Sequence, residues 1–108
     1  MSAVAQYDAY ENPTASQREA FPYFVQLQND QLAEFSTRLV MPLARLPAPP
    51  AELPRRLAQP VQVRGERLFP AAQLCATVPA RLLRRPVATL GSQASVFVDA
   101  LGAVVSGV

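Results

Sequence analysis

The sequence predicts a small, mostly antiparallel β domain that ends in one α-helix. Eleven prolines divide the chain into short pieces, which leaves little room for long helices. Most of these pieces have the alternating or apolar character of strands, and only the last stretch keeps helical spacing. With 108 residues, half of them hydrophobic, the chain (1–108) is expected to form one domain with a modest core. A second copy would bury more surface, so a homodimer is expected.

The first half predicts three strands. Residues 5–10 alternate polar and apolar side chains and end at a turn signal, Asn12-Pro13. Residues 12–20 are polar and are expected to form a loop. Residues 23–28 are the strongest strand candidate, because their side chains separate into two faces. One face holds Tyr23, Val25 and Leu27, and the other holds Phe24, Gln26 and Gln28.

After a turn at residues 29–30, residues 37–43 are expected to form the third strand. Pro42 lies within it, which predicts an edge position or a bulge, because proline has no amide hydrogen to donate. Residues 46–60 are rich in Pro and Ala. A linker here would leave two fragments too small to fold alone, so a projecting arm or loop is expected.

Short strands and turns continue in the second half. Residues 61–63 lead to a tight turn at Arg64-Gly65, and a strand is expected to run from residue 66 to residue 78, with Pro70 near its start. Residues 80–84 are a further short strand candidate. Residues 86–90 are expected to be extended or to form one turn.

From Ser92 onward the pattern becomes helical, with Ser92 as the candidate N-cap after Gly91. Apolar side chains recur at helical spacing. They are Val96, Phe97, Ala100, Leu101, Val104 and Val105. Val98 and Ala103 extend the apolar surface around much of the helix, which indicates burial on more than one side. An apolar end of this kind is tied into a core, shared with a second subunit or presented to a target.

Charge is unevenly distributed. All ten basic residues are Arg; residues 1–53 have a net charge of −3 and residues 54–108 a net charge of +5. The basic half could meet nucleic acid or an acidic partner. No aromatic side chains interleave with these Arg residues as base stacking would require, so a solvated rim is favoured over a DNA footprint.

The composition excludes most catalytic and metal chemistry. The chain has no His, which removes the Ser-His and Cys-His nucleophile pairs and the usual zinc spacings, and its glycines form no phosphate-binding loop. Glu66 and Asp99 could act as an acid and base, but nothing in the sequence brings them together. A non-enzymatic binding protein without cofactor or metal is therefore predicted.

The single Cys75 lies in an apolar run and is expected to be a buried, reduced thiol, which fits a cytoplasmic protein. The first residues lack the features of a signal peptide, and no stretch reaches the length of a membrane span. Association with a membrane is therefore not expected.

Several segments, in order, match the motifs of one known protein family. Residues 5–13 are similar to the opening Gln-Phe-x-Val-Tyr strand of that family, and residues 23–30 and 37–43 are similar to its second and third strands. Residues 60–63 and 65–68 are similar to the Pro-Val-Val turn of that family and to the strand that follows the turn. Residues 75–79, Cys-Ala-Thr-Val-Pro, match Met-Ala-Ser-Val-Pro, and the chain then aligns without a gap to a final Gly-Val in place of Gly-Ile. Together, these segments make the chain resemble the bacterial CcdB toxins.

This resemblance implies an SH3-like barrel (the CcdB/MazF-type toxin fold) with a C-terminal helix, assembled as a homodimer. It also implies a type II toxin–antitoxin toxin that binds the DNA gyrase A subunit and traps the gyrase–DNA cleavage complex. A CcdA-like antitoxin would neutralise the toxin, and operator DNA would be bound only through the complex with that antitoxin. The expected gyrase-binding residues are Val105, Ser106, Gly107 and Val108.

The resemblance also implies two further sets of functional residues, one for binding the antitoxin and one for the dimer interface. An acidic antitoxin segment would meet the basic surface, where each Arg alone is typical of solvated surface but the group is a plausible docking field. These residues are Arg55, Arg56, Arg64, Arg67, Arg84 and Arg85. A dimer would let the helix pack on both the barrel and its symmetry mate. The expected interface residues are Val96, Phe97, Ala100, Leu101 and Val104.

One difference from the family pattern leaves two alternative functions open. Ser106 stands where the family has Trp, and losing a buried Trp anchor commonly costs roughly 2 kcal/mol or more of binding free energy. The first alternative is therefore a CcdB-fold protein that no longer poisons gyrase and acts in antitoxin binding and operon autoregulation, or on another target. A less favoured alternative is an endoribonuclease toxin of the MazF type, which shares the barrel.

Overall fold

The computed structural model describes residues 5–32, 34–45 and 55–106. These residues contain seven β-strands and one α-helix, joined by short 3-10 helices. The strands are β1 (Asp8–Glu11), β2 (Tyr23–Gln26), β3 (Thr37–Ala44), β4 (Val61–Val63), β5 (Glu66–Pro70), β6 (Ala76–Pro79) and β7 (Ala88–Thr89). The helix is α1 (Ala94–Ser106), and the 3-10 helices are η1 (Ala15–Gln17), η2 (Asp30–Leu32), η3 (Arg55–Leu57), η4 (Ala72–Leu74), η5 (Ala80–Leu82) and η6 (Gly91–Gln93).

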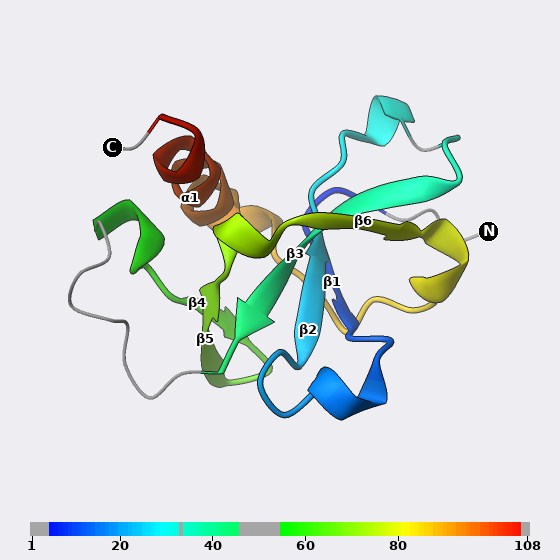
Figure 1. The fold of residues 1–108 in the computed structure, drawn as a ribbon, viewed down its shortest axis with the longest axis horizontal. Coiled ribbons are helices and arrows are strands. Elements are labelled where there is room, and N and C mark those ends of the chain that lie inside the picture. Colours follow the sequence, from blue (N-terminus) through cyan, green and yellow to red (C-terminus); the bar gives the residue numbers. More distant parts are fainter. Residues whose placement is uncertain (1–4, 33, 46–54, 107–108) are drawn as a thin grey trace.

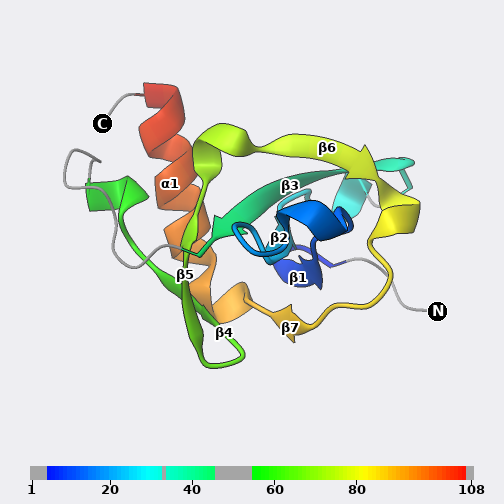
Figure 2. The same ribbon diagram turned by 60° about the horizontal axis from the view of Figure 1, so that its bottom comes forward.

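The strands form one strongly curved sheet (Figures 1 and 2). Its order is β4-β5-β3-β2-β1-β7, and β6 pairs with β3 beside β5. Every described strand pair is antiparallel. The curvature of the sheet brings its strands around into a nearly closed barrel. The helix α1 lies at one end of the barrel, next to η3 and η4 (Figure 1). The prediction of a mainly β barrel with a C-terminal helix is confirmed.

The main core lies between the sheet and α1. Its buried members are Ala9, Val25, Leu27, Met41, Leu43, Val61, Val63, Leu68, Ala72, Leu90, Phe97 and Ala100. Phe97 anchors the helix, because it has no exposed surface and its ring stacks on Tyr7 with the centroids 5.8 Å apart. Truncating a buried Phe of this kind to Ala typically costs about 3–5 kcal/mol of folding free energy.

A second, smaller core occupies the other face of the sheet. Tyr10, Val40 and Leu83 form it, with Phe24 and Val78 packed alongside. The predicted alternation of β2 is therefore confirmed. Its Tyr23, Val25 and Leu27 face belongs to the main core, while Phe24 points to the second core.

The prediction of one strand from residue 66 to residue 78 is wrong. β5 ends at Pro70, η4 follows, and β6 begins at Ala76. The break matches a change of partner along β3, whose residues 37–40 pair with β6 and residues 43–44 with β5. Pro42 lies at this junction. The predicted edge position for Pro42 is therefore wrong, because β3 is a central strand, but proline is tolerated where the ladder on that side is interrupted.

Three further boundaries differ from expectation. Residues 80–84 form no strand, because η5 closes with a hydrogen bond from Leu83 N to Ala80 O (3.0 Å) and directs Leu83 into the second core. The first strand begins at Asp8 rather than residue 5, because Tyr7 has a positive φ of 68° and belongs to a turn. Ser92 is not the N-cap residue, since it lies inside η6 and α1 begins at Ala94.

The predicted tight turn at Arg64-Gly65 is confirmed. Both residues have positive φ, 52° and 81°, which is the backbone of a two-residue type I′ hairpin between β4 and β5. Residues 46–54 of the predicted Pro-rich arm lie outside the described residues. The end of that segment forms η3, which lies against α1.

Candidate binding surfaces

The C-terminal end of α1 presents apolar side chains to solvent. Val104 is 41% exposed and Val105 is 84% exposed. The Ser106 hydroxyl donates to the backbone oxygen of Gly102 at 2.6 Å, so it is bonded within its own helix. The other two predicted target-binding residues, Gly107 and Val108, lie outside the described residues.

The predicted dimer residues occupy three different environments. Phe97 and Ala100 lie in the core of the chain itself, so their side chains are not on its surface. Val96 and Leu101 are half-buried against that core, and Val104 is exposed. The sequence pattern thus located the helix but could not separate the residues facing the barrel from those facing outward.

The sequence analysis placed one exposed apolar residue of α1, Val98, in none of the candidate sites. Val98 is 53% exposed, and helical spacing places it on the same face as Leu101 and Val105. The i, i+3, i+7 spacing of Val98, Leu101 and Val105 was the signal in the sequence that could have identified it.

Leu74 of η4, the 3-10 helix beside α1, is also exposed. Leu74 lines an apolar groove of about 470 Å³ on the outer face of β2, β3 and β6, together with Phe24 and Val78.

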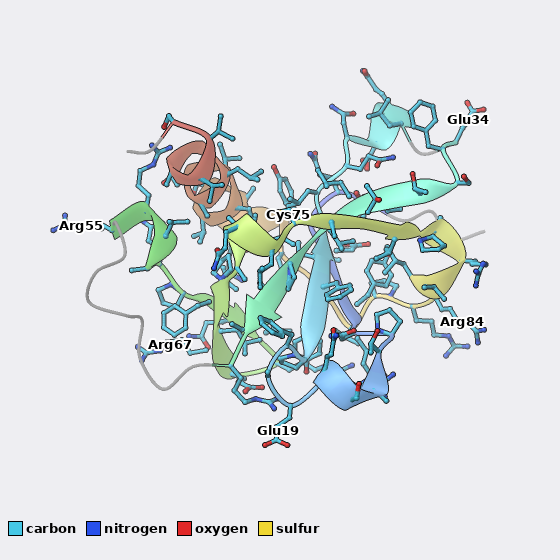
Figure 3. The ribbon with its side chains drawn as sticks, in the orientation of Figure 1. Glu19, Glu34, Arg55, Arg67, Cys75 and Arg84 are labelled. Atoms are coloured by element: carbon cyan, nitrogen blue, oxygen red, sulfur yellow. The ribbon has the colours of Figure 1, made fainter. Side chains whose placement is uncertain are left out.

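The predicted basic residues do not form one surface. Arg55 and Arg67 lie toward the α1 end of the molecule, whereas Arg84 lies at the opposite end (Figure 3). Arg56 pairs with Asp99 of α1 at 3.9 Å, and the Arg67 guanidinium lies 5.7 Å from the centroid of the Phe69 ring. The basic half of the sequence is therefore divided between two ends of the fold.

Arg84 and Arg85 line an open groove of about 600 Å³ between two loops that are distant in sequence. One wall comes from residues 11–18 and the other from residues 82–87. The groove is lined by Tyr10, Glu11, Pro13, Arg18, Leu82, Arg84, Arg85 and Val87. It therefore combines apolar surface with three guanidinium groups and one carboxylate.

The fully buried Asn12 holds the first wall in place. Its side chain accepts a hydrogen bond from Thr14 N and donates one to Phe21 O, both at 2.9 Å. Its backbone oxygen accepts from Arg18 Nε at 2.6 Å. These bonds close the loop upon itself, so this wall is ordered without a ligand.

Buried polar groups lie on the face of the sheet behind this groove. Burial raises the pKa of Tyr10 to about 12, with a smaller contribution from the nearby Asp8 carboxylate. Burial also raises the pKa of Asp8, although a backbone hydrogen bond near Ala5 opposes the shift. Gln26 is buried beside them, and its Oε1 has no hydrogen-bond partner among the described residues. The sequence predicted the alternation of side chains in β1 and β2, but it did not predict that Asp8, Tyr10 and Gln26 would be buried together.

The two carboxylates considered as an acid–base pair each contact a different arginine. Glu66 accepts from Arg45 Nε at 2.5 Å, and this hydrogen bond lowers the pKa of Glu66. Asp99 lies beside Arg56. Burial raises the pKa of the partly buried Cys75 thiol, which disfavours the reactive thiolate.

Within the described ranges, no group of three or more His, Cys, Asp or Glu side chains could hold a metal ion. In the same ranges, no helix is long and apolar enough to cross a membrane.

A comparison with models of known protein families identifies the family of the chain. The family model described as CcdB protein matches residues 6–107, nearly the whole chain. None of the curated proteins compared with the chain matches it.

Proposed function

Because the chain belongs to the CcdB family of toxin–antitoxin toxins, we propose that it binds the A subunit of DNA gyrase and traps the cleavage complex on DNA. Its action is binding, without a catalytic step of its own. The contact would be made by the C-terminal residues of α1 and the tail beyond them, namely Val105, Ser106, Gly107 and Val108.

The observation that carries this proposal is the exposed apolar end of an otherwise anchored helix. Phe97 and Ala100 hold α1 on the barrel, while Val105 is 84% exposed. A rigid element that presents an apolar side chain binds with little ordering cost, which favours recognition of a partner.

We further propose a homodimer that is neutralised in the cytoplasm by a CcdA-like antitoxin. Operator DNA would be bound only by the complex with that antitoxin. The exposed Val104 and the half-buried Leu101, one helical turn apart on α1, support the dimer, because a second copy would remove their remaining surface from water. The basic residues at both ends of the fold offer contacts to an acidic antitoxin segment.

One observation favours the alternative, a CcdB-fold protein that has lost gyrase poisoning but keeps antitoxin binding and operon autoregulation. Ser106 cannot fill an aromatic pocket, and its hydroxyl is already bonded to Gly102 O. The family Trp would supply a large apolar anchor at this position, as such residues do at many interfaces.

Plasmid cleavage by purified gyrase with ATP separates the two functions. The proposed function predicts linear DNA only when the protein is present, and less linear DNA with Val105→Glu. Ser95→Glu is the matched control, because it adds the same charge to an exposed position at the opposite end of α1. An RNA substrate incubated with the protein should remain intact.

Intact supercoiled DNA with the wild-type protein would contradict gyrase poisoning. Recovery of cleavage in Ser106→Trp would then assign the loss to the missing anchor. Degradation of RNA by the protein alone would instead support the endoribonuclease alternative.

A further inference from the structure

We propose that Arg56 is a target-contact residue, whose guanidinium binds a carboxylate of the gyrase A subunit beside the exposed end of α1. This contact rests on the proposed function and deepens it, because it adds a residue from outside the C-terminal tail to the same binding surface. Arg56 is grouped by the sequence with the candidate antitoxin contacts, since it lies in the basic half of the chain. The fold also brings it next to the last turns of α1.

Gly102 makes room for the guanidinium on α1. A Cβ built at Gly102 would meet Arg56 Nη2 and would lie 3.3 Å from Arg56 Cζ, so the guanidinium lies directly against this part of the helix. Val105 and Ser106 follow Gly102 by three and four residues, and helical spacing places them beside it on the surface of α1. The guanidinium of Arg56 therefore lies about one turn from the proposed target-binding residues.

The surroundings of the guanidinium suit a carboxylate supplied by a partner. The Arg56 side chain is 39% exposed, and its ion pair with the partly exposed Asp99 is long, at 3.9 Å. Such a pair is weak in water, and a guanidinium has several N–H donors, so a partner's carboxylate can join Asp99 or replace it. The exposed Val105 offers an apolar contact nearby. A partner that covers Val105 also shields the charged contact from water, which strengthens it.

The 3-10 helix η3 holds Arg56 in place. Ala58 N donates to Arg55 O at 3.0 Å, which closes this turn, and Leu57 packs against the main core. η3 also lies against α1. The backbone of Arg56 is therefore fixed before a partner binds, so less conformational freedom is lost on binding.

A charged contact at this place fits a chain that has Ser at position 106. The Ser106 side chain is small, and its hydroxyl is bonded to Gly102 O. The guanidinium supplies charge-assisted hydrogen bonds close to the position where the family has a large apolar anchor. The surface recognised by this chain therefore presents an acidic group in place of an aromatic pocket.

The test measures binding of the full chain to the purified gyrase A subunit, without DNA, by biolayer interferometry. Arg56→Ala should weaken binding about tenfold, and Arg56→Lys should restore only part of the loss, because an ammonium keeps the charge but not the planar fork. Arg81→Ala is the matched control, because it removes the same charge from an exposed position in η5, far from α1 (Figure 1). The control should stay within about twofold of wild type.

Gly102→Ala separates a direct contact from a structural role. The new Cβ displaces the guanidinium, so binding should weaken about fivefold, whereas urea unfolding should show no loss of stability. Asp99→Asn should strengthen binding about threefold, because Asp99 no longer competes with the target's carboxylate. In the Arg56→Ala background, Asp99→Asn should have no effect, because the guanidinium through which it acts is absent.

Three results would contradict this contact and leave the proposed function intact. They are wild-type affinity in Arg56→Ala, equal weakening in Arg56→Ala and Arg81→Ala, and an effect of Arg56→Ala that appears only when DNA is added, which would assign the guanidinium to a phosphate. Circular dichroism melts verify that each variant folds. Failure of the wild-type protein to bind the A subunit would contradict the proposed function, and this contact with it.

Discussion

Burial in the fold constrains the ionisation of Tyr10. Its pKa is raised from 10.0 to about 12, chiefly by burial. The folded state therefore keeps the phenol protonated where the unfolded state loses its proton. The stability contributed by the neutral phenol is fully present below about pH 10 and is lost as the pH rises towards 12.

The first prediction concerns Tyr10→Phe. Tyrosinate absorbance of the wild-type protein should show a late-titrating component near pH 12, and the variant should lack it. Its unfolding free energy should also fall less steeply with pH between 10 and 12. An unchanged alkaline titration in Tyr10→Phe would show that this phenol is not the protected one.

Gly102 lies inside α1 directly beneath the guanidinium of Arg56. A Cβ at position 102 would meet Arg56 Nη2, so the arginine would have to move. That group is the flexible end of a side chain, and its ion pair with Asp99 is long, at 3.9 Å, and partly exposed. Such a pair contributes about 0–1 kcal/mol, whereas replacing Gly by Ala within a helix gains about 1 kcal/mol.

The second prediction is that Gly102→Ala raises the free energy of unfolding, by about 0.5 kcal/mol, because helix propensity outweighs the displaced ion pair. Urea unfolding measures this change. Arg56→Ala/Gly102→Ala tests the cause, since without the guanidinium the gain relative to Arg56→Ala should be larger. A loss of stability in Gly102→Ala that persists in this background would refute the steric explanation.

At the scale of the element, the β4–β5 hairpin depends on two left-handed residues. Arg64 has φ 52°, an unfavourable conformation for a residue with a Cβ. Gly65 has φ 81°, and a Cβ built there would meet no atom within 4 Å. Any effect of substitution at Gly65 therefore comes from the backbone alone.

The third prediction is a pair of opposite shifts in this hairpin. Gly65→Ala should lower the free energy of unfolding by about 1 kcal/mol, and Arg64→Asn should raise it by a few tenths to about 1 kcal/mol, because Asn tolerates positive φ. Chemical denaturation of both variants measures the two shifts. Equal stability of the two variants would argue against a type I′ turn.

At the scale of the whole molecule, the outward side of α1 bears on assembly. Val104 is exposed and belongs to the predicted dimer residues, whereas Ser95 lies on another face of the same helix. A charge introduced into an apolar interface leaves an unpaired ion when two copies associate, and this opposes the dimer.

The fourth prediction is that light scattering gives the mass of a homodimer for the wild type and of a monomer for Val104→Glu. Ser95→Glu carries the same added charge and should remain dimeric. A monomeric wild type, or a dimeric Val104→Glu, would contradict an interface at this end of α1.

Most strands could be predicted from the sequence because their information is local. Alternation located β2, and the Arg64-Gly65 pair located the hairpin. The division of residues 66–78 into β5 and β6 could not be predicted in this way. It follows from the pairing of two strands with one edge of β3, and that pairing joins residues 25 to 42 positions apart.

The candidate surfaces were predictable only in part. Helical spacing identified the apolar character of α1, but the side facing the barrel could not be read from a helix that is apolar on most sides. The six predicted arginines were grouped by their place in the sequence. The fold instead separates Arg55 and Arg67 from Arg84.

The sequence by itself determined the fold class, the hairpin turn, the position of the helix and membership of the CcdB family, because local periodicity, turn residues and ordered motifs carry that information. Only the tertiary structure decided that Phe97 is core while Val98 and Val105 are exposed. It alone also joined the 11–18 and 82–87 loops into one groove. The burial of these side chains and the shape of the groove both depend on contacts between segments that are distant in the sequence. Such contacts form only when the chain folds, so no local sequence pattern predicts them.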